Sequence, residues 1–271
     1  MKIKGRLQKF LFTNTGNEYS IIPNYILELS TEKLNMEDQI GKTVRFKYLN
    51  RISCINCGRD TKKSYGQGFC YPCFLSVPQT EECVFHPELC RAHEGQARDM
   101  EYAKENCLID QYAYFALSGG LKVGVTRYHQ VPIRWVDQGA VKAIKVVKTS
   151  NRYLSGLVEV ELKKVFADKT NWRKMLTEND SDQNLIEKKE EALELLEKKN
   201  LQFQNTDNNE YFIQYPIISF PPKVISINLE AIPVIEGEIA GIKGQYIIFT
   251  SGEVLNIRKH SGFHVEMEID L

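Results

Sequence analysis

The chain of 271 residues lacks three features, and each absence excludes a broad class of protein. No apolar run approaches the roughly 20 residues of a membrane-spanning helix, so we expect no membrane partner. The segment Met1–Lys9 alternates like a strand and has no apolar core of a secretory leader, which predicts a cytoplasmic protein. Lys plus Arg and Asp plus Glu number 35 each, and this zero net charge argues against a polyanion-binding surface over the whole protein.

The charges are nevertheless unevenly distributed along the chain. Residues 122–174 contain twelve Lys or Arg and four Asp or Glu, whereas residues 178–199 contain eight acids and four lysines. A basic region that precedes an acidic helix fits a nucleic-acid-binding face, with Lys142, Lys145 and Lys148 as phosphate contacts. An ordinary solvated surface explains the same charges, so composition leaves both interpretations open.

All seven cysteines fall between positions 54 and 107. Cys54 and Cys57 form one CxxC pair, and Cys70 and Cys73 form a second pair after a polar, Gly-rich segment of twelve residues. Two such pairs can place four thiolates around one ion, the geometry of structural zinc, and Gly58 suits the tight turn behind Cys57. A redox dithiol or two disulfides are the alternatives, and the lack of a leader makes disulfides less favourable.

The remaining cysteines predict a second metal site. Cys83, Cys90 and Cys107, with His93 three residues after Cys90, supply a closed set of three thiolates and one imidazole. His86 is an alternative ligand in place of one of these residues. The alternative to a metal site is that these cysteines are small buried apolar residues.

The hydrophobic pattern predicts an α+β protein in four consecutive parts. Residues 1–50 and 216–271 read as terminal β units, residues 51–108 as the zinc module, and residues 109–215 as a small α/β domain with an extra helix at 182–200. The terminal β units share a motif, because Leu34-Asn35 and Leu255-Asn256 are each followed six residues later by a glycine and a strand. This repeat suggests that the two ends form one small sheet or barrel.

The α/β domain has a clear order of predicted elements. Strands at 112–117 and 121–126 flank a turn at Ser118-Gly-Gly120, and a short helix follows at 132–138. A strand at 141–147 and a helix capped by Ser150 or Asn151 complete the order strand, strand, helix, strand, helix.

Two resemblances accompany these patterns. Nearly the full length resembles an uncharacterised bacterial family of unknown function, through the twin CxxC motif and the segments Gly68–Phe74, Pro87–Cys90, Leu121–Arg127, Arg134–Ala140 and Gly241–Tyr246. Residues 112–173 are similar to the GIY-YIG nuclease superfamily, which has the same order of elements.

The second resemblance implies a set of site residues. Tyr114 takes the place of the first signature tyrosine, Arg134 matches the helix arginine, Glu159 matches the glutamate that binds Mg²⁺ or Mn²⁺, and Asn171 is a looser match. Lys122 stands where the second tyrosine would be, so the resemblance leaves open whether the protein is an enzyme.

Three functions therefore follow from the sequence. The first is a zinc-stabilised nuclease that acts on DNA or RNA with a GIY-YIG-like centre. The second is a nucleic-acid-binding protein on the same fold without catalysis, and the third is a protein-interaction adaptor built on zinc knuckles. Arg134 and Glu159 favour the first, Lys122 favours the second, and the zero net charge favours the third.

Overall fold

The computed structural model describes residues 1–166, 171–178 and 182–269. The chain forms two compact units. The first comprises residues 1–17, 21–75 and 214–271, and the second comprises residues 18–20 and 76–213. This division differs from the four consecutive parts expected from the sequence, because the two ends of the chain share one unit. The two cysteine sets, expected in one module at 51–108, also belong to different units.

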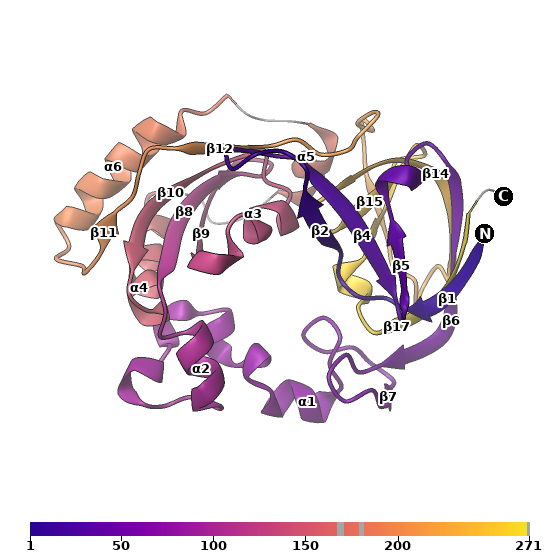
Figure 1. The fold of residues 1–271 in the computed structure, drawn as a ribbon, viewed down its shortest axis with the longest axis horizontal. Helices are drawn as coiled ribbons and strands as arrows, with labels where there is room; N and C mark the ends of the chain where they lie inside the picture. Colours follow the sequence, from indigo (N-terminus) through magenta and orange to yellow (C-terminus); the bar gives the residue numbers. More distant parts are fainter. Residues whose placement is uncertain (167–170, 179–181, 270–271) are drawn as a thin grey trace. The chain divides into compact units, whose positions relative to one another are not determined.

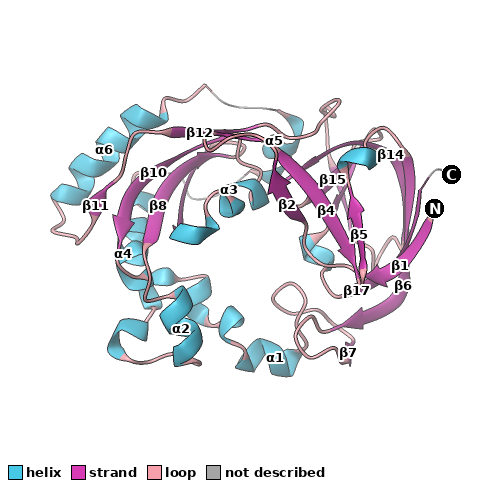
Figure 2. Ribbon diagram, in the orientation of Figure 1, coloured by secondary structure: helices cyan, strands magenta, loops and turns pink. Residues whose placement is uncertain are grey.

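The first unit is built mainly of strands (Figure 2). Its larger sheet has the order β1-β17-β6-β14-β15-β16-β13, and β7 pairs with β6. A three-stranded sheet has the order β2-β4-β5, and both described sheets are open rather than closed into a barrel. The strands are β1 (Lys2–Arg6), β2 (Leu11–Asn14), β4 (Pro23–Leu29), β5 (Glu32–Asn35), β6 (Thr43–Ser53), β7 (Asp60–Thr61), β13 (Ile225–Ile227), β14 (Val234–Lys243), β15 (Tyr246–Phe249), β16 (Glu253–Asn256) and β17 (Phe263–Ile269).

The short sequence repeat corresponds to a repeated structure. The hairpin β4–β5, the turn η1 (Glu37–Gln39) and β6 match the hairpin β15–β16, the turn η7 (Arg258–His260) and β17. Asn35 and Asn256 end the hairpins, and the side-chain oxygen of each accepts a hydrogen bond from a backbone N–H in the turn that follows. Gly41 and Gly262 then adopt φ of 82° and 92°, a region that favours glycine, before the last strand of each repeat.

The two repeats meet in the larger sheet around a local twofold relation. The first repeat runs from β1 to β6 and the second from β14 to β17. In the sheet order β1-β17-β6-β14, the final strands β6 and β17 pair with each other, and each also pairs with the first strand of the other repeat. The register is reciprocal: Phe46 faces Met267 at the centre, and the flanking pairs are Val44 with Ile269 and Tyr48 with Val265. The ends of the chain therefore do form one sheet, as the repeat suggested.

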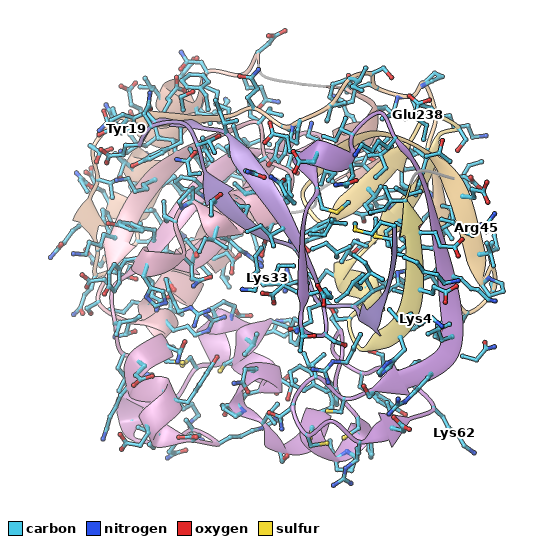
Figure 3. All side chains as sticks on the ribbon, turned by 45° about the vertical axis from the view of Figure 1, so that its right-hand side comes forward. Lys4, Tyr19, Lys33, Arg45, Lys62 and Glu238 are labelled. Carbon is cyan, nitrogen blue, oxygen red and sulfur yellow. The ribbon has the colours of Figure 1, made fainter. Side chains whose placement is uncertain are left out.

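Ion pairs cover one face of this sheet. Lys4 and Arg45, labelled in Figure 3, lie on β1 and β6. Lys4 pairs with Glu266 at 2.8 Å, and Arg45 pairs with Glu268 at 2.8 Å and Glu236 at 2.7 Å. In β17 the side chains of Glu266 and Glu268 share one face of the strand, with Glu266 buried beneath its lysine partners, whereas Val265 and Met267 are buried on the opposite face.

The second unit contains the predicted α/β order. β8 (Gln111–Leu117) and β9 (Leu121–Arg127) form a hairpin, α3 (Ile133–Asp137) follows, and β10 (Lys142–Thr149) precedes α4 (Arg152–Lys163). The sheet order is β3-β12-β10-β8-β9 with β11 beside β10, and α4 packs on the sheet (Figure 1). The other elements are β3 (Ser20–Ile21), of which Ser20 belongs to this unit, α5 (Trp172–Thr177), α6 (Leu185–Glu197), β11 (Gln204–Asn205) and β12 (Glu210–Ile213).

A segment of short turns leads into this sheet. It consists of η2 (Pro78–Thr80), η3 (Glu82–Val84), η4 (Pro87–Leu89), η5 (Ala92–Glu94) and α2 (Met100–Asn106), preceded in the chain by α1 (Tyr71–Ser76). Gly156 on α4 permits a close approach of η4, because a Cβ there would lie 2.1 Å from the Glu88 nitrogen. The segment is therefore packed directly against α4.

Candidate functional site

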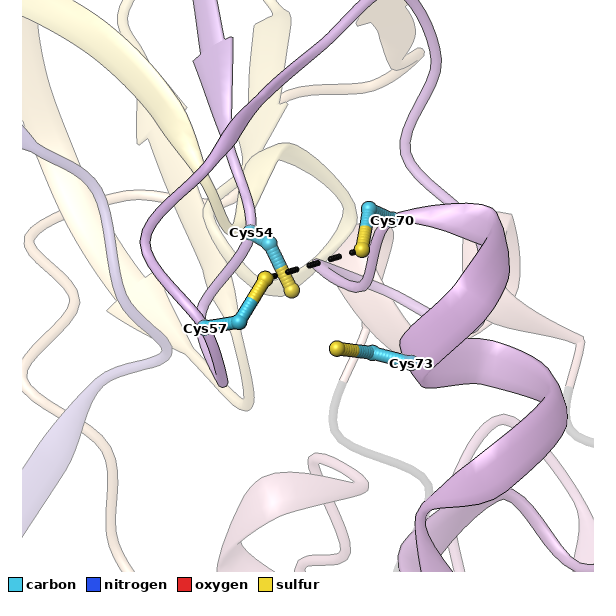
Figure 4. Close-up of side chains that lie close together, drawn as sticks. All are labelled: Cys54, Cys57, Cys70 and Cys73. Carbon is cyan, nitrogen blue, oxygen red and sulfur yellow. Dashed lines mark hydrogen bonds between the residues drawn. The ribbon is translucent and has the colours of Figure 1, made fainter.

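The first unit brings the four cysteines of the twin CxxC motif together (Figure 4). The sulfurs of Cys54, Cys57, Cys70 and Cys73 all lie within 4.8 Å of one another, and Cys57 Sγ is 3.7 Å from Cys70 Sγ. Four sulfurs about 2.3 Å from one zinc ion would lie about 3.8 Å apart at the corners of a tetrahedron. All seven cysteines carry free thiols, so these sulfurs are not joined as disulfides.

Backbone geometry around the motif explains why the sulfurs converge. Cys54 directly follows β6, and the chain reverses at Gly58, whose φ is 75° and whose N–H donates to the Cys54 carbonyl. Gly68, with φ of 131°, allows the second CxxC pair to approach, because a Cβ there would lie 2.8 Å from the Ile55 side chain. Cys70 and Cys73 then flank the first turn of α1.

Hydrogen bonds lower the pKa values of Cys54 and Cys57, whereas at Cys73 the lowering by the Asn56 amide is outweighed by burial and the neighbouring thiols, which raise its pKa to about 12. Burial opposes the ionisation of Cys54, but backbone N–H groups of Cys57, Cys70 and Asn56 outweigh it and lower its pKa to about 6. The Asn56 amide donates to Cys73 Sγ at 3.4 Å. Backbone and side-chain hydrogen-bond donors surround the four sulfurs, so the sulfurs fit a metal ion held by four thiolates. An ion with four thiolate ligands has no open coordination position for catalysis.

The second cysteine set lies in the other unit and is less tightly assembled. Cys83, Cys90 and Cys107 are buried in one cluster, and each thiol interacts with the other two. His93 stacks on Tyr153 with ring centroids 4.3 Å apart. Within the described residues, only the first set has all its ligand atoms inside 4.8 Å, so ligation by the second set requires the thiols and His93 to close further. The alternative ligand His86 is exposed and lies 3.4 Å from Glu88.

Tyr114 occupies the centre of a buried polar group in the second unit. It lies on β8 opposite Gly124 of β9, and a Cβ at position 124 would lie 2.5 Å from the Tyr114 hydroxyl. Burial raises the pKa of Tyr114, the Arg134 guanidinium opposes this rise, and the Glu159 carboxylate adds to it. Arg134 on α3 and Glu159 on α4 are therefore both close enough to Tyr114 on β8 to affect the pKa of its phenol.

Gln138, at the end of α3, connects two of these residues. With its amide nitrogen donating to the Tyr114 hydroxyl oxygen at 2.8 Å, its amide oxygen accepts from Nε and Nη2 of Arg134, each at 3.2 Å. In this orientation Gln138 forms hydrogen bonds with both Tyr114 and Arg134, and the Tyr114 O–H does not donate to Gln138. Gln138 is not among the site residues that the sequence indicates, although its position four residues after Arg134 on a predicted helix places the two side chains on one face.

Glu159 is the buried carboxylate of this region. Its side chain is 10% exposed, and Lys163 Nζ lies 3.3 Å away. Burial raises the pKa of Glu159, and Lys163 only partly offsets that rise. A buried carboxylate that one lysine does not fully compensate is a donor that a divalent cation would stabilise, so Glu159 fits the metal-binding role that the resemblance implies.

The other two residues implied by the resemblance have different surroundings. Lys122 lies on β9 opposite Ala116, two residues before Gly124. Asn171 is exposed and caps α5, where its side-chain oxygen accepts a hydrogen bond from the Lys174 N–H at 3.1 Å. The observed role of Asn171 is therefore helix capping, which uses the side chain that the resemblance assigns to the site.

The three lysines expected to contact phosphates each face a carboxylate. Lys142 pairs with Glu210 at 2.7 Å, Lys145 with Asp207 at 3.0 Å, and Lys148 with Asp110 at 2.6 Å. The partners of Lys142 and Lys145 lie in the segment after α6. Counting charges along the sequence does not reveal that this segment lies beside β10. This face is therefore less basic than the sequence alone indicates.

Comparison with known proteins identifies the family. A family described as protein of unknown function, DUF2797, matches residues 41–265, so the chain belongs to this family. Neither a curated protein nor a solved structure matches the chain. Among the described residues, no helix is long and apolar enough to cross a membrane.

Proposed function

We propose that this protein binds nucleic acid and cuts its phosphodiester backbone with a divalent metal ion, in the manner of the GIY-YIG nucleases. One observation carries the proposal: Gln138 connects Tyr114 on β8 to Arg134 on α3, and the Glu159 carboxylate on α4 adds to the rise that burial causes in the pKa of Tyr114. The connection of elements in this unit follows the order of that superfamily. We further propose that zinc is the ion of the four-cysteine site, with a structural role.

The residues of the buried polar group have distinct tasks in this proposal. Glu159 holds Mg²⁺ or Mn²⁺, which when bound supplies charge neutralisation at the phosphate and its leaving oxygen. Arg134 donates to a phosphate oxygen that gains charge, and Gln138 holds its guanidinium in place. The phenol of Tyr114, whose pKa burial raises further above neutrality, donates a hydrogen bond to the substrate or to the attacking water in this proposal.

A second function, nucleic-acid binding without cleavage, is favoured by Lys122. A lysine in place of the second signature tyrosine holds a phosphate as a point charge but does not reproduce the hydrogen-bonding pattern of a phenol. On this alternative, Arg134 and Lys122 bind the backbone and Glu159 has no metal to hold.

Cleavage and binding assays on the full chain separate these functions. Purified protein is incubated with Mg²⁺ or Mn²⁺ and labelled single-stranded or double-stranded DNA or RNA, and binding is measured in parallel by anisotropy. Glu159→Gln should abolish cutting and leave binding largely intact, because the amide keeps the shape of the carboxylate and loses its charge. Glu161→Gln is the matched control, since Glu161 lies on the same helix and pairs with Lys164.

Each result favours one function. Metal-dependent cutting that Glu159→Gln abolishes and Glu161→Gln retains supports the nuclease. Binding without cutting in either metal supports the non-catalytic binder, and Arg134→Ala should then weaken affinity. If the protein binds none of the four polymers at low salt, both nucleic-acid functions fail and the adaptor hypothesis remains.

A further inference from the structure

The segment between η2 and α2 has little that would hold it folded without an added ligand. It consists of four 3-10 turns and one helix of seven residues. The buried residues of its core cluster are Cys83, Cys90 and Cys107 with two alanines, Ala92 and Ala103. Ala97, Met100 and Tyr153 pack against the cluster and are only partly buried, so the cluster fully buries no large aliphatic side chain. Segments of this composition gain their stability from disulfides or from a metal, and the three thiols are free.

The cysteine cluster is bonded directly to the first turn of α4. The Arg152 backbone N–H donates to the Cys107 carbonyl at 2.8 Å. The Arg152 side chain donates from Nε to the Cys83 carbonyl at 2.8 Å and from Nη2 to the Val84 carbonyl at 2.9 Å. One residue of α4 therefore joins two of the three cysteine-bearing segments.

Two further contacts continue along the helix. His93 stacks on Tyr153 with an interplanar angle of 19°, which places its imidazole at the edge of the cysteine cluster. Gly156, one turn after Arg152, receives the backbone of Glu88. Glu159 follows three residues later on the same face of the helix, so the segment that bears the cysteines supports the part of α4 that carries the buried carboxylate.

We propose that Cys83, Cys90, Cys107 and His93 bind a second zinc ion, and that this ion clamps α4 so that Glu159 is held in position. The zinc draws the three thiolates and the imidazole into one tetrahedron and thereby fixes the carbonyl groups that Arg152 bonds. The Ala92 N–H, which already donates to the Cys90 thiol, provides the backbone hydrogen bond that supports a thiolate ligand. The positioning role of the clamp rests on the proposed function of Glu159, whereas the presence of the ion does not.

Metal analysis of the full chain tests the presence of the site. The wild-type protein should contain two zinc ions per chain, and Cys107→Ser and Cys57→Ser should each lose one. Substitution by Co²⁺ should give two sets of thiolate charge-transfer bands, and His93→Gln should change the visible bands of only one set. One zinc ion per wild-type chain would overturn the proposal even if Cys107→Ser does not fold, as would unchanged Co²⁺ bands in His93→Gln.

Hydrogen exchange tests the clamp. Amides of α4 should lose protection in His93→Gln and Cys107→Ser and keep it in Cys57→Ser, whose sulfur belongs to the other site. Loss of zinc without loss of amide protection in α4 would contradict the proposal that the ion holds this helix in position. Neither measurement uses nucleic acid, so a failed cleavage assay and a failed second zinc site are separate results.

Discussion

At the scale of single residues, the buried polar group around Tyr114 depends on a glycine in the neighbouring strand. Gly124 lies opposite Tyr114 and leaves the space that the phenol ring fills, so the hydroxyl can reach Gln138. Gln138 in turn orients Arg134. The group therefore combines a phenol, an amide and a guanidinium that hydrogen bonds join, with the Glu159 carboxylate near enough to affect the pKa of the phenol.

Replacing the Tyr114 hydroxyl should destabilise the protein. Tyr114→Phe keeps the ring and removes the partner of the Gln138 amide, and leaving a buried amide unsatisfied costs about 1–3 kcal/mol. Chemical denaturation measures the loss. Tyr128→Phe, at a side chain that is 52% exposed, should change the stability by less than about 0.5 kcal/mol, and an equal effect of both substitutions would contradict the network.

The pH dependence of stability should differ in sign between two glutamates of α4. The pKa of Glu159 is raised by burial, so protonation of this group stabilises the folded state, and its own contribution to stability falls as pH rises above the ordinary carboxyl pKa of about 4.3. Glu159→Gln should therefore gain melting temperature over wild type as pH rises from about 4 to 7.

Glu161 provides the opposite case on the same helix. Its hydrogen bond with Lys164 lowers its pKa, so its stabilisation is present above the ordinary carboxyl pKa and is lost as pH falls. Glu161→Gln should be less stable than wild type at pH 7, with a difference that shrinks in acid. Melting curves from pH 3 to 8 that show parallel behaviour of both variants would refute the assignment of opposite environments.

At the scale of elements, the repeated unit of hairpin, turn and strand explains how the ends of the chain form one sheet. Each repeat begins with a strand that contains a glycine, Gly5 in β1 and Gly237 in β14, and each glycine approaches the hairpin of its own repeat. The close approach is tighter in the first repeat. A Cβ at position 5 would lie 2.5 Å from the Leu29 backbone, whereas a Cβ at position 237 would lie 3.2 Å from the Phe249 ring.

The two equivalent glycines should therefore differ in their tolerance of a methyl group. Gly5→Ala forces a backbone shift and should cost about 1–3 kcal/mol. Gly237→Ala should cost less, because the Phe249 side chain can move by a few tenths of an ångström. Urea denaturation of the two variants checks the order, and a larger loss in Gly237→Ala would show that the repeats do not pack as described.

At the scale of the whole molecule, many of the equally numerous basic and acidic residues meet as ion pairs, including lysines in the region that is basic in the sequence. Lysines on β10 and carboxylates more than sixty residues away neutralise each other within the second unit. The basic character of residues 122–174 is therefore partly used in ion pairs that stabilise the sheet. A nucleic-acid substrate would depend more on the buried polar group around Arg134 than on a broad basic surface.

Substitution of a β10 lysine should consequently affect stability more than affinity. Lys142→Gln leaves Glu210, which is 19% exposed, without its ion-pair partner, and should cost about 1–3 kcal/mol. Binding to any nucleic acid should be nearly unchanged. Lys164→Gln should change the stability by less than about 1 kcal/mol, because the Lys164 side chain is 58% exposed and Lys199 also lies 3.6 Å from Glu161. A large loss of affinity with unchanged stability in Lys142→Gln would restore the role of the β10 lysines as phosphate contacts.

Local sequence determined the elements and one cluster of four cysteines that could hold a metal ion. The alternating pattern of β17, the turn glycines and the Asn151 cap of α4 act over a few residues, so periodicity and capping rules identified them. The CxxC spacing likewise restricts two sulfurs at a time to one turn, which is why the four-cysteine site could be predicted before its geometry was seen.

Tertiary structure alone decided which distant residues meet. The pairing of β1 with β17, the carboxylate partners of Lys142 and Lys145, and the bonds from Arg152 to the cysteine segment join positions separated by tens to hundreds of residues. Such contacts depend on the packing of whole elements, and no local pattern specifies their partners. For the same reason the sequence suggested Tyr114, Arg134 and Glu159 as single candidates, and only the fold brought them into one electrostatic neighbourhood and added Gln138 between two of them.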